Sequence, residues 1–335
     1  MKLEKIKLFN EDGDDRQESQ KILGGNPTGI TNMNQTAFPW TNSMYMNMMK
    51  NHWIPQKVSL VDDKATIKLL TEKEIEVTEL TLSYLVFLDS YQILNLPNIA
   101  EYITCTAVKD LIVIQQFQEV VHSRSYQYIL DSLFPLLTKE RIYNLWRDNP
   151  LLKKRVKKVA EVGQAFLDEP SLENFKKVLA MNFILEGIFF YQGFNFFDQL
   201  RSRSKLVQTG QEIDYIRRDE ATHMALFIHL IKHTFEKEDY NMLTSLMKEN
   251  VEEEIEFSHK IYGNHILGIS EDSSAQYLEY LGNHRIQSFG LPHIYPEQGL
   301  TNPYKHLEGD KRNNFFESTV TEYDNSASID GWEDF

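Results

Sequence analysis

The sequence predicts an all-α protein, with one large helical bundle between an irregular arm and an acidic tail. All ten prolines lie at or before Pro170 or at or after Pro292, so residues 171–291 contain none. A proline-free block of that size, with apolar residues at helical spacing, is typical of long helices. No convincing alternation of apolar and polar residues predicts a strand, apart from a short candidate at residues 56–60. The 335 residues would allow two domains, but the helical block favours one.

Prolines and capping residues divide the bundle into its expected helices. Asn95 and Pro97 interrupt one helix, and Asn98 could begin the next. Pro150 and Pro170 resemble helix starts, because proline is favourable in a first turn and acidic residues beside it complement the helix dipole. The expected helices cover residues 39–52, 74–94, 98–124, 127–134, 139–147, 151–167, 172–201, 208–235, 238–262 and 271–288.

The two ends of the chain differ from this block. Residues 1–30 are expected to form an irregular arm with the turn sequence GGNPTG, residues 31–307 the helical domain, and residues 308–335 a flexible acidic tail. The last 23 residues hold six acidic side chains and neither Lys nor Arg, so they cannot bury enough apolar surface to fold alone. Trp332 and Phe335 are expected to anchor this tail in a groove on a partner, rather than to be incidental aromatic residues of a frayed end.

Charge and cysteine content exclude several classes of protein. The chain has 35 basic and 49 acidic residues, and its net charge of −14 argues against a nucleic-acid-binding protein. The single cysteine, Cys105, excludes a disulfide framework, a Cys-rich zinc site and a dithiol redox couple, and it favours a reducing, cytoplasmic setting. No secretory signal or membrane span is expected, because the most apolar stretch, residues 182–197, contains Glu186, Gln192 and Asn195.

Three Glu-x-x-His pairs place a carboxylate and an imidazole on one helix face. With 10 histidines and 49 acidic residues, chance alone gives about one or two such pairs, so the context must decide. Glu256–His259 lies among other glutamates and is expected to be a solvated acidic face. Glu119–His122 and Glu220–His223 lie in apolar helices, where burial is costly unless these groups are paired or bind a metal.

Two isolated acids complete a repeated pattern. Asp89 precedes Glu119 by 30 residues, and Glu186 precedes Glu220 by 34, so one antiparallel helix hairpin would bring each pair to the same height. Two carboxylates plus two Glu-x-x-His units are typical of a dimetal site in a four-helix bundle. The alternative is a set of satisfied polar core groups. Carboxylate and imidazole ligands suit iron or manganese.

Tyr126 follows His122 by one helical turn, in the block EVVHSRSY. This block resembles the radical-generating small subunit of class I ribonucleotide reductase. The resemblance covers residues 22–335 and includes, in the family's order, NHWIPQKVSL, FLDSYQ, LEGIFFYQGF, RDEATH and the tail segment FFESTVTEY. It implies a ferritin-like fold and an oxidoreductase that, with a large subunit, reduces ribonucleoside diphosphates to deoxyribonucleotides.

The resemblance also implies roles for particular residues. One metal ion would be held by Asp89, Glu119 and His122, and the other by Glu186, Glu220 and His223, with Glu119 and Glu220 as bridges. Tyr126 would carry the stable tyrosyl radical. An apolar pocket would protect this radical from water and reductants, and its implied members are Phe190, Phe194 and Ile216.

A long-range transfer path is implied as well. Its residues, in order, would be Tyr126, His122 at the metal site, Asp219, Trp53 and Tyr323 in the tail. Trp40 competes with Trp53 for this role, but the block NHWIP around Trp53 matches the family and the surroundings of Trp40 do not.

The partners follow from the same resemblance. Nucleotide reduction in this family needs a thiyl radical and a dithiol, which one cysteine cannot supply, so a separate large subunit would dock on the C-terminal tail. A homodimer is implied, with a flavodoxin-like activase or a ferredoxin as a further partner. The cofactor would be a di-iron centre, with dimanganese as the alternative. The presence of Tyr126 argues that this chain is not one of the family members that lack the radical tyrosine. The competing functions are a ferritin-like dimetal ligand-binding oxidase and a metal storage protein, each without a partner subunit.

Overall fold

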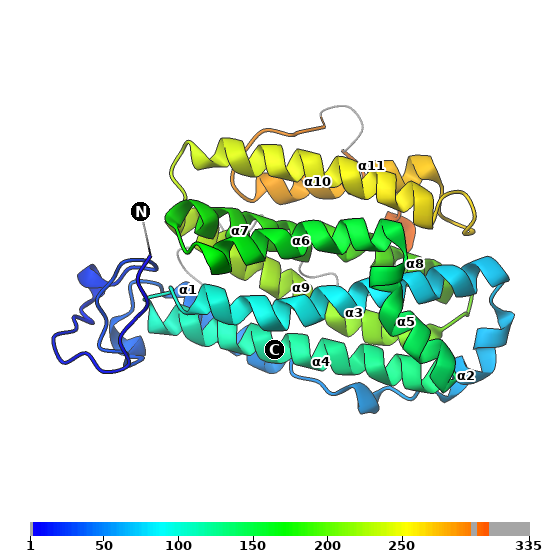
Figure 1. Ribbon diagram of the computed structural model, residues 1–335, viewed down its shortest axis with the longest axis horizontal. Coiled ribbons are helices and arrows are strands. Elements are labelled where there is room, and N and C mark those ends of the chain that lie inside the picture. The colour runs from blue at the N-terminus through cyan, green and yellow to red at the C-terminus, as the bar shows by residue number, and fades with distance from the viewer. Residues whose placement is uncertain (1–2, 296–299, 308–335) are drawn as a thin grey trace.

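The computed structural model describes residues 3–295 and 300–307, and over these ranges the chain is helical without a strand (Figure 1). The helices are α1 (Trp40–Lys50), α2 (Val61–Thr66), α3 (Glu72–Ala100), α4 (Thr106–Leu133), α5 (Leu136–Asp148), α6 (Pro150–Asp168), α7 (Leu172–Ile184), α8 (Tyr191–Arg201), α9 (Val207–Thr234), α10 (Asp239–Ile261) and α11 (Glu271–Gln287). Short turns are η1 (Gln17–Ser19), η2 (Met33–Gln35), η3 (Pro55–Lys57), η4 (Ile67–Leu69) and η6 (Lys305–Leu307), and η5 (Leu185–Phe189) is a π-helical turn.

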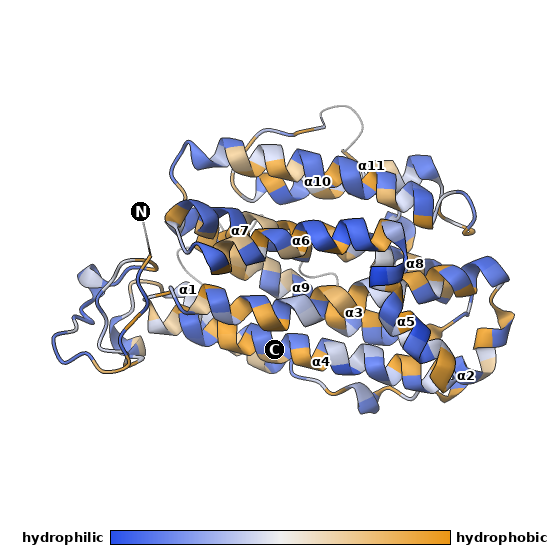
Figure 2. Cartoon of the chain, in the orientation of Figure 1, coloured by the Kyte–Doolittle hydropathy of each residue, from blue (hydrophilic) through white to orange (hydrophobic). Residues whose placement is uncertain are grey.

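The long helices run along a common direction and form a bundle (Figure 1). Helix α3 packs along α4, α9 packs against α4, α7 and α8, and α10 packs along α11. Outer helices such as α6 show stripes of apolar and polar residues, which is the pattern expected of a helix with one buried face (Figure 2). None of the helices in the described ranges is long and apolar enough to span a bilayer.

Helix α3 corrects the expected break at Pro97. The helix continues through Pro97 to Ala100, so neither Asn95 nor Asn98 marks a boundary. A proline inside a helix leaves the carbonyl four residues earlier without its usual partner. Here that carbonyl belongs to Ile93, and it accepts a 3.0 Å hydrogen bond from the Gln116 side chain of α4. The replacement bond explains why the sequence rule fails at this position.

Three other expectations also need correction. Helix α4 is continuous through residues 125–126, where two helices were expected, and it contains no Gly or Pro that could break it. The expected helix at 172–201 is divided by the π-helical turn η5 into α7 and α8. The candidate strand at residues 56–60 is wrong, because η3 begins at Pro55 and the backbone there turns.

The start of α9 is fixed from a distant part of the chain. Leu206, just before the helix, has a left-handed backbone with φ of 47°. The buried carboxylate of Asp63 accepts hydrogen bonds from the backbone N–H groups of Gln208 (3.1 Å) and Thr209 (2.6 Å). These N–H groups lack partners within the helix, so Asp63 caps α9. This cap sets the position of the helix that carries much of the site.

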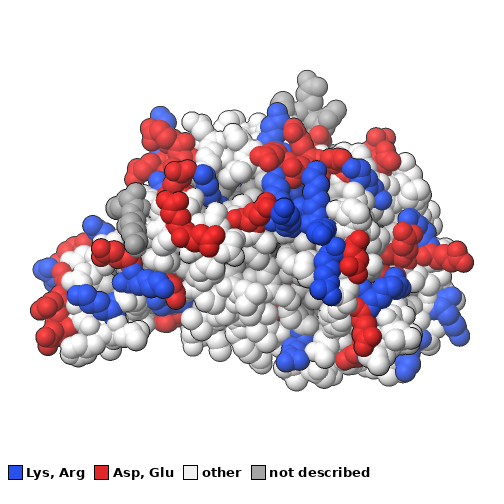
Figure 3. Space-filling view, viewed as in Figure 1, with Lys and Arg blue, Asp and Glu red and all other residues white. Residues whose placement is uncertain are grey.

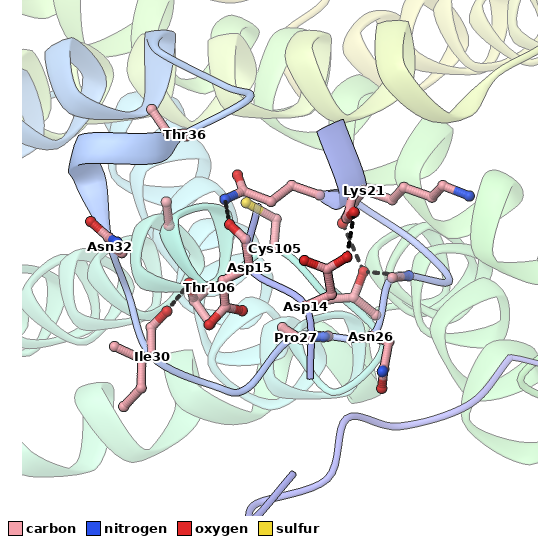
Figure 4. Close-up of a pocket in the computed structure, with 15 residues that line it drawn as sticks. Asp14, Asp15, Lys21, Asn26, Pro27, Ile30, Asn32, Thr36, Cys105 and Thr106 are labelled. Atoms are coloured by element: carbon pink, nitrogen blue, oxygen red, sulfur yellow. Dashed lines mark hydrogen bonds between the residues drawn. The ribbon is translucent and has the colours of Figure 1, made fainter. Parts of the chain in front are cut away.

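The N-terminal arm is attached to the loop between α3 and α4. The backbone N–H of Thr104 donates to Ile22 (2.8 Å), and its hydroxyl donates to the Lys21 carbonyl (2.7 Å). Asp14, Asp15 and residues around Cys105 line a cavity of about 20 Å³ between the arm and this loop (Figure 4). That volume is close to what one water molecule needs. The cavity therefore has no room for a substrate.

On the face shown in Figure 3, basic and acidic side chains are interleaved over α6 and α10. Lys158 of α6 illustrates this arrangement, since it forms ion pairs of 2.7 Å with both Glu249 and Glu253 of α10. The negative net charge is thus not gathered in one patch on this face.

Candidate metal centre

Six buried side chains meet in the middle of the bundle. They come from α3, α4, η5 and α9, which pack on one another there (Figure 1). They form two overlapping groups, and within each group the ligand atoms lie within 4.8 Å of one another. The first group is Asp89, Glu119, His122 and Glu220, and the second is Glu119, Glu186, Glu220 and His223.

Glu119 and Glu220 each face both histidines. Glu119 places Oε2 3.5 Å from Nδ1 of His122 and Oε1 3.2 Å from Nδ1 of His223. Glu220 places Oε1 3.1 Å from Nδ1 of His122 and Oε2 2.8 Å from Nδ1 of His223. Each carboxylate thus offers one oxygen to each half of the cluster. This is the arrangement that a carboxylate bridging two ions requires.

The cluster fits a pair of cations. Several of its buried atoms make no hydrogen bond of good geometry in the described part of the chain, even where Nδ1 of His122 lies close to Glu220: both Asp89 oxygens, Glu119 Oε2, His122 Nδ1, Glu186 Oε2 and Glu220 Oε1. The described chain places no Lys or Arg in an ion pair with these four carboxylates. Buried charges need compensation, and two divalent cations would balance four carboxylates. The oxygen and imidazole donors suit iron or manganese.

The pKa shifts show the same need for positive charge. Burial, with the nearby charges of Glu119 and Glu220, raises the pKa values of Asp89 and Glu186 well above the usual range for carboxyl groups. Burial alone would lower the pKa of His122, but Glu220 and the other carboxylates raise it well above its ordinary value. For Glu220 the two effects are reversed: burial would raise its pKa, but the two histidines hold the pKa below its usual range. Protons and cations therefore compete for this cluster.

Outer hydrogen bonds orient both imidazole rings. His122 Nε2 lies 3.3 Å from Asp219 Oδ2, and His223 Nε2 lies 3.0 Å from Gln118 Oε1. In each ring the Nδ1 atom is thereby left facing the cluster. An acceptor on the remote nitrogen keeps the proton there and the lone pair toward a metal.

Asp219 also connects the cluster to Trp53. The indole Nε1–H of Trp53, which is 5% exposed, donates a 2.8 Å hydrogen bond to the same Oδ2 atom that contacts His122. Arg218 flanks the other oxygen at 3.3 Å. Trp40 lies elsewhere, stacked on His229 with ring centroids 4.1 Å apart. The structure thus brings Trp53, Asp219 and His122 into contact and leaves Trp40 outside this group.

Tyr126 is completely buried on α4, and its hydroxyl lies beside the carboxylate of Asp89. Burial, with the charges of Asp89, Glu220 and Glu119, raises its pKa well above the usual value. The three residues of the expected apolar pocket belong to the same hydrophobic core and are fully buried: Phe190, Phe194 and Ile216. The expected tail residues Tyr323, Trp332 and Phe335 lie outside the described residues.

Three glutamines that were not predicted as site residues also contact the cluster. Gln115 donates to Glu186 Oε1 (2.9 Å) and Glu119 Oε1 (3.3 Å), Gln92 also donates to Glu186 Oε1, and Gln118 contacts His223. Helical spacing could have found them, since each lies three or four residues from a predicted ligand.

The third Glu-x-x-His pair has a different environment. Glu256 is exposed on α10 and pairs with Lys260, and His259 Nε2 lies 3.0 Å from the carbonyl of Glu271. The same spacing on a solvated face thus builds no cluster with the six buried residues.

Comparisons with known proteins agree with this geometry. Residues 30–303 match the family described as "Ribonucleotide reductase, small chain". A ribonucleoside-diphosphate reductase subunit beta from Treponema pallidum (strain Nichols) is 34% identical over 98% of this chain and 97% of its own length. The corresponding protein of Halalkalibacterium halodurans is 31% identical over 99% of both chains. The solved ribonucleotide reductase R2 subunit from Clostridium botulinum superposes with a TM-score of 0.88 at 36% identity, covering 92% of this chain and 99% of that one. With its buried carboxylates and histidines in a helical bundle, this chain belongs to the small-chain family of ribonucleotide reductase.

Proposed function

We propose that this small subunit generates and stores a tyrosyl radical on Tyr126 and passes the oxidising equivalent to a large subunit that reduces ribonucleoside diphosphates. The observation that carries the proposal is the placement of Glu119 and Glu220, each of which offers one oxygen to each imidazole. A buried tyrosine on the same helix as Glu119 and His122 completes the arrangement.

The proposed ligands are Asp89, Glu119 and His122 for one ion and Glu186, Glu220 and His223 for the other. Both clusters of ligand atoms are compact enough for this assignment. When bound and activated, the metal pair supplies an oxidant that takes one electron from a phenol. The donor set suits both iron and manganese. We assign iron to both positions and keep manganese as the alternative.

The chain's own residues protect the radical. Tyr126 would give one electron to the oxidant and its hydroxyl proton to the neighbouring Asp89 carboxylate. Complete burial keeps water and reductants away from the ring. Phe190 and Phe194 stack with centroids 5.7 Å apart and provide apolar, redox-inert surroundings. Ile216 adds an aliphatic side chain to the same core.

The proposed exit path runs from His122 through Asp219 and Trp53 to Tyr323. The two contacts on Asp219 Oδ2, at 3.3 Å and 2.8 Å, support its first half. Asp219 accepts the Trp53 N–H and is placed to hold a proton when the charge on the indole changes. Tyr323 enters the path through its position in the sequence VTEY.

A small subunit acts with a large subunit, and the further partner assignments are proposals. The tail docks on the large subunit through Trp332 and Phe335, and the chain forms a homodimer. A flavodoxin-like activase or a ferredoxin supplies electrons for activation. The single cysteine supports a cytoplasmic setting.

Electron paramagnetic resonance tests the central step. Metal-free protein is loaded with iron or manganese and exposed to oxygen or, for manganese, to its activating flavoprotein. A tyrosyl radical signal is expected in the wild type and should be lost in Tyr126→Phe, with metal content unchanged. Metal-replete wild type that gives no radical with either metal would contradict the proposal and favour a storage protein or a partner-free oxidase.

A second experiment tests the exit path. Tyr323→Phe should abolish nucleotide reduction with the large subunit while the Tyr126 radical signal keeps its intensity. A variant that still turns over would remove Tyr323 from the path and leave the radical assignment intact.

A further inference from the structure

The π-helical turn η5 carries Glu186, so its shape decides where this carboxylate lies. A π-helical turn widens the backbone by one residue and interrupts the regular α-helical hydrogen bonds. Glu186 and Gly187 lie within this turn, between α7 and α8. Such turns need support from neighbouring elements, because a regular α-helix is the ordinary alternative for the same residues.

Arg285 of α11 contacts this turn directly. Its side chain is 1% exposed, and its Nε–H donates a 3.2 Å hydrogen bond to the carbonyl oxygen of Gly187. Its guanidinium lies over the ring of Tyr191, 4.8 Å from the centroid. A Cβ atom at Gly187 would lie 3.4 Å from Nε of Arg285 and 3.2 Å from Sδ of Met224. A methyl group at this position would thus press on Met224 and touch Arg285.

Charge pairing does not account for Arg285. In the part of the chain that the structure describes, its polar neighbours are the Gly187 carbonyl and Nδ1 of His284, and no carboxylate forms an ion pair with it. Arg155, the other buried arginine beside η5, differs because it pairs with Glu254 at 2.6 Å while its guanidinium lies 3.7 Å from the Phe189 centroid. A buried cation without a carboxylate is costly, so a contribution of another kind is expected.

We propose that Arg285 is a positioning residue that holds the η5 turn in the shape that brings Glu186 to the metal centre. The proposal rests on the dimetal site proposed above. Glu186 belongs to the second group of ligands and is absent from the first. Loss of the Arg285 contact should therefore lower the affinity for metal at one position and leave the affinity at the other unchanged. A general loss of stability would weaken both.

A manganese titration tests this difference. Metal-free wild type and Arg285→Met are titrated with Mn²⁺ alone, and the unbound ion is measured by electron paramagnetic resonance. The wild type should bind two ions. The variant should bind the first ion with unchanged affinity and the second at least about tenfold more weakly, as is usual when a support of a metal ligand is removed. Equal weakening of both positions, or no weakening, would overturn the role of Arg285.

Two further variants make the test independent of folding defects. Gly187→Ala should reproduce the selective loss, because its methyl group would lie 3.2 Å from Sδ of Met224 and 3.4 Å from Nε of Arg285 and so shift the packing on the η5 turn. This variant carries the test if Arg285→Met does not fold. Arg155→Met combined with Glu254→Leu removes the other buried arginine with its partner and should keep both metal positions. A wild type that binds fewer than two ions would contradict the dimetal site itself, and the role of Arg285 would fall with it.

Discussion

Two buried clusters of charge in this bundle are compensated in opposite ways. Near α6 and α10, Arg155 pairs with Glu254 at 2.6 Å and with Glu253 at 3.2 Å, so the protein supplies its own cation. At the metal centre, four carboxylates and two histidines meet without a Lys or Arg in an ion pair, as far as the described residues extend.

The difference separates a structural ion pair from a ligand set. Both clusters are buried and both carry perturbed pKa values, so neither burial nor titration behaviour identifies the site. Burial raises the pKa of Glu254 to about 7 even with Arg155 beside it. What distinguishes the six-residue cluster is the missing internal cation, since buried carboxylate oxygens without a hydrogen bond occur in both clusters.

The largest effect is expected from removing a residue that both groups of ligands share. Glu119→Ala should abolish two-ion loading and the tyrosyl radical, because this carboxylate contacts both histidines. Metal analysis and electron paramagnetic resonance measure the two outcomes. Glu256→Ala is the matched control, since it removes the glutamate of an exposed Glu-x-x-His pair and should change neither. A Glu119→Ala protein that still binds two ions would erase the distinction between the clusters.

Breaking the structural ion pair should lower stability and leave the metal content unchanged. Arg155→Met is expected to cost about 3–5 kcal/mol in the free energy of unfolding, because it leaves the buried Glu254 without its cation. Adding Glu254→Leu should recover most of this loss, since a complete buried pair can often be replaced by apolar groups. Urea denaturation of both variants measures the difference. A double variant no more stable than Arg155→Met would show that the pair is not the source of the loss.

Glu212 provides an intermediate case, a buried acid with neither arginine nor metal ligands as partners. Its carboxylate accepts a 2.5 Å hydrogen bond from Ser125, and burial raises its pKa to about 7 from an ordinary value of 4.5. The folded state therefore keeps a proton that the unfolded chain loses above about pH 4.5. The contribution of this group to the free energy of unfolding should therefore fall as the pH rises from about 4.5 to about 7.

Glu212→Gln should remove that part of the pH dependence. Between pH 5 and pH 8, the free energy of unfolding of the variant should rise by roughly 2 kcal/mol relative to that of the wild type. Denaturation of both proteins in metal-free form at the two pH values gives this difference directly. An identical pH dependence in the two proteins would mean that Glu212 is ionised in the folded state.

The smallest effect is expected from the amide that orients His223. Gln118→Leu removes the acceptor 3.0 Å from Nε2, so affinity for the second ion should fall about tenfold. Gln116→Leu is a suitable control, because this neighbouring side chain bonds to the Ile93 carbonyl and lies outside the ligand groups. Metal titration measures the affinity of both variants for the second ion. Equal affinities would contradict the role of Gln118 in orienting His223.

The clustering of the six buried side chains could be predicted because their pattern is repeated and local. An isolated acid followed by a hairpin and a Glu-x-x-His pair occurs twice, and helical spacing turns each pair into one face of a helix. The third pair, Glu256–His259, has the same spacing, and only its acidic neighbours predicted its exposed position.

Helical spacing places the supporting glutamines on the faces of the predicted ligands, but it does not identify the groups that they contact. Gln92 and Gln115 are ordinary helix formers in sequence, and their role depends on how η5 lies against α3 and α4. Arg285 lies 98 positions from the Gly187 carbonyl that it contacts. The helix break predicted at Pro97 is wrong for the same reason, since the residue that compensates for the proline, Gln116, lies on another helix.

The capped start of α9 has a consequence for biosynthesis. The Trp53–Asp219 bond closes over 166 positions, and the Asp63–Thr209 cap closes over 146. At about 5–20 residues per second, a ribosome needs on the order of 10–30 s to make the intervening chain. During that time Trp53 and Asp63 have emerged without their partners, and no complete ligand set exists to receive an ion. A dimetal centre built from these residues could therefore be filled only after α9 has been made.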